Sequence, residues 1–178
     1  AGGCGNVISS NHSDAFIIGS DITALGDCTT FFNNTSYYFQ SGTTSYLSSG
    51  DSAGEIVYFG VSLTLTAGDL YYLGNTSDGT WAQADADAVG SASGMLAIAL
   101  GTSVSDGMLI RGFYRNSAYT FSNEGSPLYI STTAGDMTQT APSGGGDVVR
   151  IVGYLASSAQ DTIYFSPDNT WIQIEAAP

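Results

Sequence analysis

Apolar and turn-forming residues recur at a spacing of fourteen over the first forty residues of the chain. Written in rows of fourteen, the sequence reads AGGCGNVISSNHSD, AFIIGSDITALGDC and TTFFNNTSYYFQ, and its apolar columns alternate with columns of residues that suit turns. Such a repeat predicts a short β-solenoid, or β-roll, in which each coil buries its inward face by stacking on the next. The columns group Gly2 with Phe16 and Thr30, Cys4 with Ile18 and Phe32, Gly5 with Gly19 and Asn33, and Ile8 with Ile22.

So few coils cannot bury their own apolar side chains. Phe16, Ile18, Ile22 and Phe32 would stay partly in water unless further coils or other chains cover them. We therefore expect these four residues to form a solenoid core that is completed by association with other chains.

From residue 55 onward the pattern changes to short runs of alternating apolar and polar residues. Turn signals such as Gly-Asp, Asp-Gly, Gly-Ser-Pro and Pro-Asp-Asn separate these runs, which predicts an antiparallel β-sandwich or barrel of eight or nine strands. The predicted strands are IVYFGVSLTLT, DLYYLG, GTWAQA, GMLAIALGT, GMLIRGFYR, SPLYIST, DVVRIVGYL, DTIYFSP and TWIQIEA.

The chain thus divides into a solenoid end at residues 1–36, a neck or linker at 37–54 and a β-sandwich at 55–178. The neck, YYFQSGTTSYLSSGDSAG, is rich in Ser, Gly, Thr and Tyr and has no sustained period, which is typical of a linker. The predicted fold class is all-β with almost no helix, because the longest helix-compatible stretch, residues 81–88, is short and interrupted by aspartates. From the opening sequence AGGCG we expect a part of a longer product.

The segment at residues 5–34, GNVISSNHSDAFIIGSDITALGDCTTFFNN, resembles the head repeats of trimeric autotransporter adhesins and segments of phage and large-virus tail fibres. Residues 15–24 and 29–34 carry the resemblance, whereas Phe32 and the loss of pattern after Asn34 depart from it. The resemblance implies a left-handed β-roll in which three chains wrap one axis, and hence an intertwined homotrimer.

The segment at residues 55–178 resembles a domain that recurs at the ends of phage structural and fibre proteins. Residues 125–135, 141–143, 147–154 and 163–167 carry this resemblance, which implies a capsid or fibre module. The predicted function is that of a virion structural protein on the virion surface, a trimeric tail-fibre or capsid-fibre module for host attachment or capsid decoration. Its expected partners are its own copies, other virion proteins, and a host-surface glycan or protein receptor.

Two other classes of protein share this architecture. A bacterial trimeric adhesin or surface-filament subunit is the first alternative, and a fragment of a polysaccharide-degrading tailspike is the second.

The net charge of the chain argues against binding to nucleic acids and to anionic membranes. Three arginines and no lysine stand against sixteen acidic residues, which gives a net charge of −13. Because nucleic-acid binding requires Lys and Arg to neutralise phosphates, we expect no nucleic-acid partner, and anionic membranes are disfavoured for the same reason. No apolar run is long enough to insert into a membrane. The acidity is explained by solubility alone.

The loop AQADADAVG holds the strongest candidates for chemistry. In an extended strand, Asp85 and Asp87 would point to one side, as polysaccharide hydrolysis or calcium binding would need, but the spacing also suits a solvated loop. We predict no catalytic residue, no metal and no cofactor, and keep Asp85, Asp87 and Trp81 as residues that could face a ligand. Trp81 could stack on a sugar or fill the core, and Trp171 is expected in the core.

The remaining candidate groups have structural explanations. Arg111 and Arg150 lie within apolar runs, where an arginine usually pairs with a carboxylate or a carbonyl group at a strand or subunit boundary; the alternative is that they bind an acidic receptor sugar. His12, the single histidine, lies in a turn sequence. Cys4 and Cys28 are compatible with two buried thiols or with one disulfide.

Overall fold

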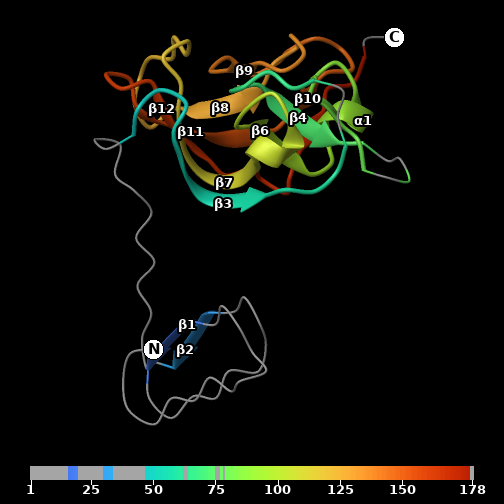
Figure 1. Ribbon diagram of the computed structural model, residues 1–178. Helices are drawn as coiled ribbons and strands as arrows, with labels where there is room; N and C mark the ends of the chain where they lie inside the picture. Colours follow the sequence, from blue (N-terminus) through green and yellow to red (C-terminus); the bar gives the residue numbers. More distant parts are fainter. Residues whose placement is uncertain are drawn as a thin grey trace. The chain divides into compact units, whose positions relative to one another are not determined.

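A computed structural model describes residues 16–19, 30–33, 47–61, 64–74, 77 and 79–176. The chain forms two compact units, Ala1–Gln40 and Ser41–Pro178 (Figure 1). With 38% strand and 6% helix it is all-β, as predicted. The elements are β1 (Phe16–Gly19), β2 (Thr30–Asn33), β3 (Ser52–Val57), β4 (Leu70–Leu73), β5 (Trp81–Gln83), α1 (Val89–Ala92), β6 (Leu96–Ala99), the 3₁₀ helix η2 (Val104–Asp106), β7 (Met108–Arg115), β8 (Pro127–Ile130), β9 (Met137–Thr138), β10 (Val148–Val149), β11 (Ile151–Ser157), β12 (Thr162–Phe165) and β13 (Ile172–Gln173).

The described part of the N-terminal unit is a pair of parallel strands, β1 and β2. Partner residues are fourteen apart along the whole pair, which confirms the register of the columns found in the sequence. The pairs are Phe16 with Thr30, Ile17 with Phe31, Ile18 with Phe32, and Gly19 with Asn33.

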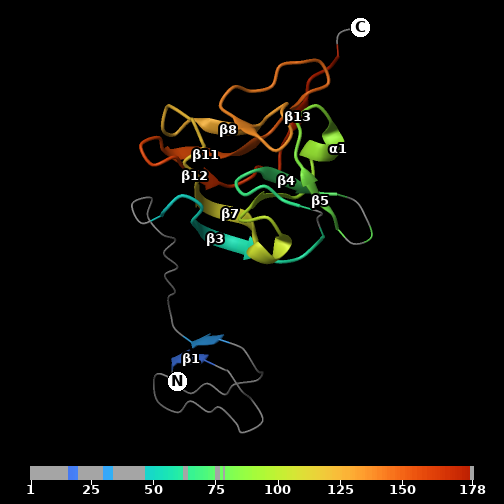
Figure 2. The ribbon, with the colours of Figure 1, turned by 45° about the horizontal axis from the view of Figure 1, so that its top comes forward.

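The C-terminal unit is built on one curled, nine-stranded antiparallel sheet (Figure 1, Figure 2). Its strands follow the order β5-β4-β6-β7-β12-β11-β8-β9, and β3 pairs with β7. The start of β7, at Met108 and Leu109, pairs with β6, whereas residues from Gly112 to Arg115 pair with β12. The sheet therefore consists of two half-sheets that share β7. Each of the nine predicted runs contains strand residues. The predicted antiparallel sandwich or barrel is present as one curled antiparallel sheet, and β10 and β13 pair as a separate two-stranded sheet.

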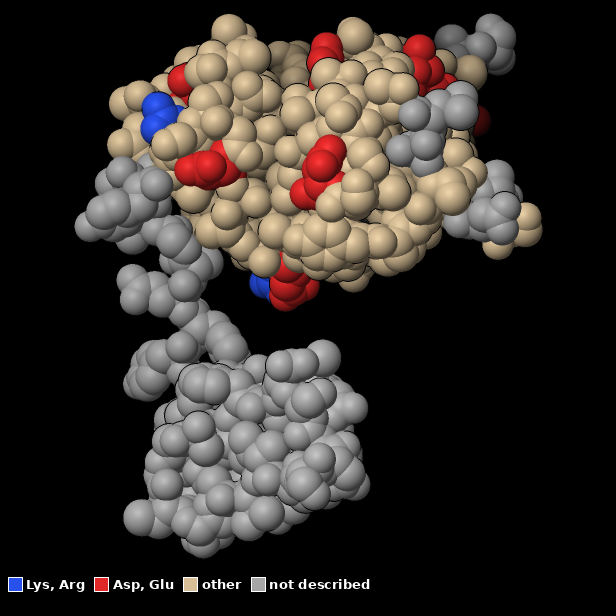
Figure 3. Space-filling model, viewed as in Figure 1, with Lys and Arg blue, Asp and Glu red and all other residues tan. Residues whose placement is uncertain are grey.

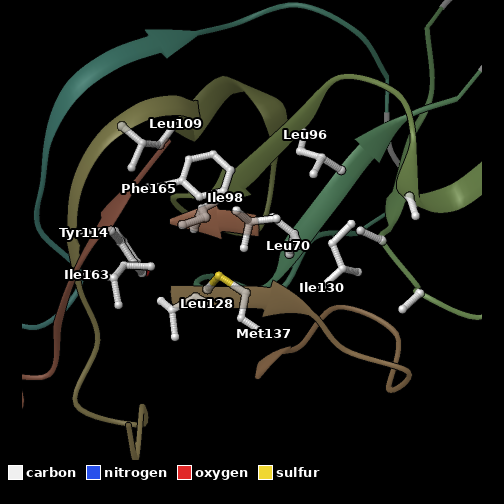
Figure 4. Packing of buried hydrophobic residues seen from close by; sticks show 14 of the residues in the cluster. Leu70, Leu96, Ile98, Leu109, Tyr114, Leu128, Ile130, Met137, Ile163 and Phe165 are labelled. Atoms are coloured by element: carbon white, nitrogen blue, oxygen red, sulfur yellow. The ribbon is translucent and has the colours of Figure 1, made fainter. Parts of the chain in front are cut away.

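The main core lies between the two half-sheets, where side chains from both converge (Figure 4). Leu70 and Ile98 come from β4 and β6, Leu109 from β7, Leu128 from β8 and Phe165 from β12, and all five are fully buried. Burial of such side chains stabilises the fold by about 1.5 to 3 kcal/mol each.

A second, smaller cluster covers the opposite face of the β4–β6–β7 half-sheet. Because side chains alternate along a strand, Tyr71, Ala97 and Met108 point away from the main core and pack with Leu65 and Trp81. All four residues of β6 are therefore buried, which explains its uninterrupted apolar sequence LAIA.

The C-terminal unit begins earlier than predicted. Strand β3 starts at Ser52, inside the expected neck at 37–54, and Leu47 is already buried. Arg115 Nη1 donates to the Leu47 carbonyl oxygen, and Ser49 Oγ donates to Ser117 Oγ at 3.0 Å. Backbone pairing with β7 holds residues 52–54, and the two side-chain hydrogen bonds hold Leu47 and Ser49. None of these contacts depends on apolar alternation, so the C-terminal unit extends to the N-terminal side of the predicted boundary at residue 55.

Acidic side chains are dispersed over the described face in Figure 3 and do not gather in one patch. Within the part of the chain that the structure describes, no helix has the length and apolar character needed to cross a membrane.

Candidate functional site

Asp85 and Asp87 form a turn. The Asp87 N–H donates to Asp85 Oδ1 at 2.9 Å, and Ser91 Oγ donates to the Asp85 carbonyl oxygen at 2.8 Å. Desolvation by neighbouring atoms raises the pKa of the exposed Asp87 carboxyl group, and the charges of Asp85 and Asp147 raise it further. The described residues contain no group of three or more His, Cys, Asp or Glu that could hold a metal ion. This loop is therefore explained by its own hydrogen bonds.

Trp81 belongs to the second core cluster and also lines a hollow with Tyr71 and Gln83. Its side chain is 3% exposed, and its Nε1 donates to the Phe59 carbonyl oxygen at 2.8 Å. The Phe59 ring lies 6.0 Å from the Trp81 ring, and Val61 bridges to Thr80 beside it. The segment at 58–61 thus covers part of the indole, which supports the core position, one of the two alternatives that the sequence left open for Trp81. Trp171 packs against the main core, as predicted.

The arginines have structural roles. Arg150 is 5% exposed and donates to the carbonyl oxygens of Ala92, Gly94 and Asp168, each at 2.7 Å, which confirms the predicted pairing with carbonyl groups. Burial lowers the pKa of Arg150, and the nearby Asp168 charge opposes this effect. Arg111 is exposed and its Nε lies 3.4 Å from the Tyr164 hydroxyl group.

The predicted solenoid-core residues Phe16, Ile18 and Phe32 lie on β1 and β2. Four other predicted residues, Cys4, His12, Ile22 and Cys28, lie outside the described residues.

One type of turn occurs four times in the C-terminal unit and leads directly into a strand each time. Its third residue is a glycine with φ between 85° and 99°, a conformation that L side chains rarely adopt. Its fourth residue is an aspartate whose N–H donates to the carbonyl oxygen of the first residue. The turns are Ser48-Ser49-Gly50-Asp51, Thr66-Ala67-Gly68-Asp69, Thr133-Ala134-Gly135-Asp136 and Gly144-Gly145-Gly146-Asp147.

In the first and last of these turns the aspartate carboxylate closes its own turn. Asp51 Oδ2 accepts a hydrogen bond from the Ser48 N–H, and Asp147 Oδ2 accepts one from the Gly144 N–H, both at 2.7 Å. These carboxylates therefore have a structural role, like that of an Asx turn.

In the two Thr-Ala-Gly-Asp turns, other side chains take over that role. The Tyr71 hydroxyl group accepts from the Thr66 N–H at 2.8 Å, and Ser131 Oγ accepts from the Thr133 N–H at 3.0 Å. Closure of these turns consequently does not use the carboxylates of Asp69 and Asp136.

The two Thr-Ala-Gly-Asp turns meet at a hollow of about 360 Å³. The Leu70 N–H donates to the Gly135 carbonyl oxygen at 2.7 Å and joins the turns. The segment after β7 forms the third wall, where the Tyr119 hydroxyl group donates to the Gly68 carbonyl oxygen at 2.7 Å. The hollow is lined by residues 66–69, 116, 118–121 and 135–137.

The hollow is acidic, since Asp69 and Asp136 both line it. Burial raises the pKa of Asp69, the hydrogen bond that Gln83 Nε2 donates to Asp69 Oδ2 at 2.8 Å lowers it, and the Asp136 charge raises it again, with a net upward shift. Burial also raises the pKa of Tyr119, which keeps its hydroxyl group neutral. None of the arginines in the described ranges lines the hollow.

The raised pKa of Asp69 predicts a pH-dependent gain in stability for Asp69→Asn. The folded state binds the Asp69 proton more tightly than the unfolded state does, so protonation of Asp69 stabilises the fold. This stabilisation is complete below the ordinary pKa of 3.8 and is lost as the pH rises through the folded-state pKa. Asparagine carries no ionisable proton, so the Asp69→Asn variant has no such loss of stability as the pH rises. At pH 7 Asp69→Asn should therefore unfold at a temperature no lower than wild type, as followed by circular dichroism; a clear decrease at pH 7 would contradict the assignment.

No protein-family model matches the chain, and no curated protein matches it.

The sequence did not reveal the hollow, because Asp69 and Asp136 are far apart in the chain. The one signal that could have indicated it is the exact repetition of Thr-Ala-Gly-Asp at residues 66–69 and 133–136.

Proposed function

We propose that the chain is a structural and attachment module of a homotrimeric virion fibre or spike. In this proposal the N-terminal unit is the end of a β-solenoid shaft, and the C-terminal unit presents its loops to a host surface. The observation that carries the proposal is the parallel pairing of β1 and β2 at a constant offset of fourteen residues. Successive solenoid coils produce one constant offset between parallel strands, and the sequence of this segment resembles trimeric fibre and adhesin repeats.

Association into a trimer supplies what the short shaft lacks. Two or three coils expose their lateral apolar side chains, and a shared threefold axis would bury them. Phe16, Ile18 and Phe32 lie on the paired strands and are the residues that we assign to this shared core.

The C-terminal unit also offers a surface on which like-charged copies could meet. Tyr58, Phe59 and Val61 are 65%, 46% and 48% exposed, and no charged residue occurs between Ile56 and Gly68. On a chain with a net charge of −13, an uncharged apolar surface of this kind favours contact between copies, because it adds no repulsion.

Native mass spectrometry tests the trimer directly. We expect a particle of three chains of 18.4 kDa each, and we expect Ile18→Asp to convert it to monomers, because a carboxylate in the shared core would be buried without a partner. The C-terminal unit should keep its near-ultraviolet circular dichroism in this variant.

Ser20→Asp is the matched control for the shaft substitution. Asn6, Ser20 and Asn34 form a polar column in the fourteen-residue rows, so the same charge added there should leave the trimer intact. A wild-type monomer at micromolar concentration, or a trimer that survives Ile18→Asp, would contradict the proposed shaft.

A further inference from the structure

We propose that the hollow between the two Thr-Ala-Gly-Asp turns binds an uncharged sugar ring, with Asp69 and Asp136 accepting hydrogen bonds from its hydroxyl groups. The inference rests on the attachment role proposed for the chain and gives that role a site and a ligand class.

The four related turns use their aspartates in two different ways. Asp51 and Asp147 are used inside their own turns, whereas Tyr71 and Ser131 make the corresponding hydrogen bonds in place of Asp69 and Asp136. Neither Thr-Ala-Gly-Asp turn needs its carboxylate for closure: Asp69 Oδ2 instead accepts from Gln83 Nε2, and the Asp69 and Asp136 carboxylates lie near enough to repel each other, which costs stability. Such a cost is typical of residues retained for binding.

The size and the lining of the hollow are compatible with a small ligand. About 360 Å³ lies at the small end of ligand-binding cavities and suits one sugar ring. Tyr119 and Phe121, whose ring centroids are 5.2 Å apart, supply apolar surface for the C–H face of a sugar. Asn116 and Thr120 add polar groups, and Asn116 Oδ1 already accepts from the Ala118 N–H at 3.0 Å, which leaves its NH₂ group as the donor.

The charge of the hollow discriminates among classes of ligand. Two carboxylates without a lining arginine repel acidic sugars and phosphates. Among the described residues, no third His, Cys, Asp or Glu joins this pair, so a calcium ion would have to take most of its six to eight oxygen ligands from carbonyl groups and water. Carboxylates are strong acceptors for neutral hydroxyl donors, so a neutral sugar fits the chemistry best.

Nuclear magnetic resonance titration of the intact, uniformly labelled protein tests the site. The probes are the methyl glycosides of glucose, galactose and mannose, with N-acetylneuraminic acid and calcium chloride as competing ligand classes. We expect saturable shifts of the backbone amide signals of residues 66–69, 116–121 and 135–137 with at least one neutral glycoside, and no such shifts with the acidic sugar.

Substitutions then identify the groups that bind. Asp69→Asn and Asp136→Asn should each weaken binding of the glycoside about tenfold, the loss expected for one hydrogen bond to a charged acceptor. Asp51→Asn is the matched control, because it removes the same charge from the same type of turn outside the hollow. Its affinity for the glycoside should equal that of wild type.

Three results would overturn the inference: no saturable shift with any neutral glycoside, saturation by calcium alone, or equal weakening by Asp51→Asn. Native mass spectrometry of the same samples separates this inference from the fibre role. A trimer that binds no glycoside refutes the sugar site alone, and a monomer that binds one refutes the fibre role alone.

Discussion

Replacement of Arg150 by methionine is expected to lower the free energy of unfolding of the C-terminal unit by about 3 to 5 kcal/mol. Arg150 lies between β10 and β11, and its guanidinium group binds the carbonyl oxygens of Ala92, Gly94 and Asp168. It thereby ties the end of α1 to the loop after β12. Methionine fills part of the volume but donates no hydrogen bond, so three carbonyl groups would lose their donor in a place where Arg150 itself is 5% exposed.

Urea denaturation followed by circular dichroism, at one protein concentration for all variants, measures this loss. Arg150→Lys should fall between methionine and wild type, because an ammonium group cannot reproduce the planar fork of donors. Arg111→Met is the control, since Arg111 is exposed and should change stability by no more than about 0.5 kcal/mol. Equal effects of Arg150→Met and Arg111→Met would show that water replaces the lost donors.

The sequence predicted the regular parts of the fold well, because periodicity reports directly on which side chains are buried. The fourteen-residue columns match the pairing of Phe16 with Thr30 and of Ile18 with Phe32. Alternating runs likewise located the strands of the C-terminal unit. Strand order and the curl of the sheet could not be predicted in this way, since they depend on which strands pair and not on the residue pattern within each strand.

The features that were missed depend on contacts between distant segments. Residues 52–54, Ser-Ala-Gly, show no apolar alternation, yet they pair with β7 and belong to the sheet. Trp81 could be assigned to the core only once the segment at 58–61 was seen to cover it. The sequence placed residues 52–54 in the neck and left the position of Trp81 open, because backbone pairing and coverage by a distant segment leave little trace in local composition.

The candidate site was missed for a related reason. Asp85 and Asp87 drew attention because they are close in sequence, but the structure uses Asp85 to hold its own loop. Asp69 and Asp136 instead come together through two copies of one turn. The repeated Thr-Ala-Gly-Asp sequence is a better guide to the candidate site than the density of acidic residues along the chain. In the structure, Tyr71 closes one copy of this turn and Ser131 closes the other, so the two aspartate side chains are not used for closure.

Gly112→Ala is expected to destabilise the C-terminal unit by about 2 to 4 kcal/mol, because this residue lies where β7 passes from one half-sheet to the other. Gly112 has φ 141°, which L side chains rarely adopt, and a Cβ atom there would overlap the Ala53 carbonyl oxygen and lie 2.6 Å from Gly54 Cα. Gly54 is the cross-strand partner of Gly112, so the two glycines allow β3 and β7 to approach each other closely.

The reciprocal substitution sharpens this prediction. A Cβ atom at Gly54 would overlap the Arg111 carbonyl oxygen, so Gly54→Ala should also be destabilising. Because both methyl groups push apart the same pair of strands, the double variant should lose less stability than the two single losses added together. Gly90→Ala in α1 is the control, since its methyl group would meet nothing within 4 Å, and there alanine should be neutral or stabilising. Urea denaturation of the four variants measures these differences; a Gly112→Ala protein as stable as Gly90→Ala would mean that β3 and β7 can separate at this point without cost.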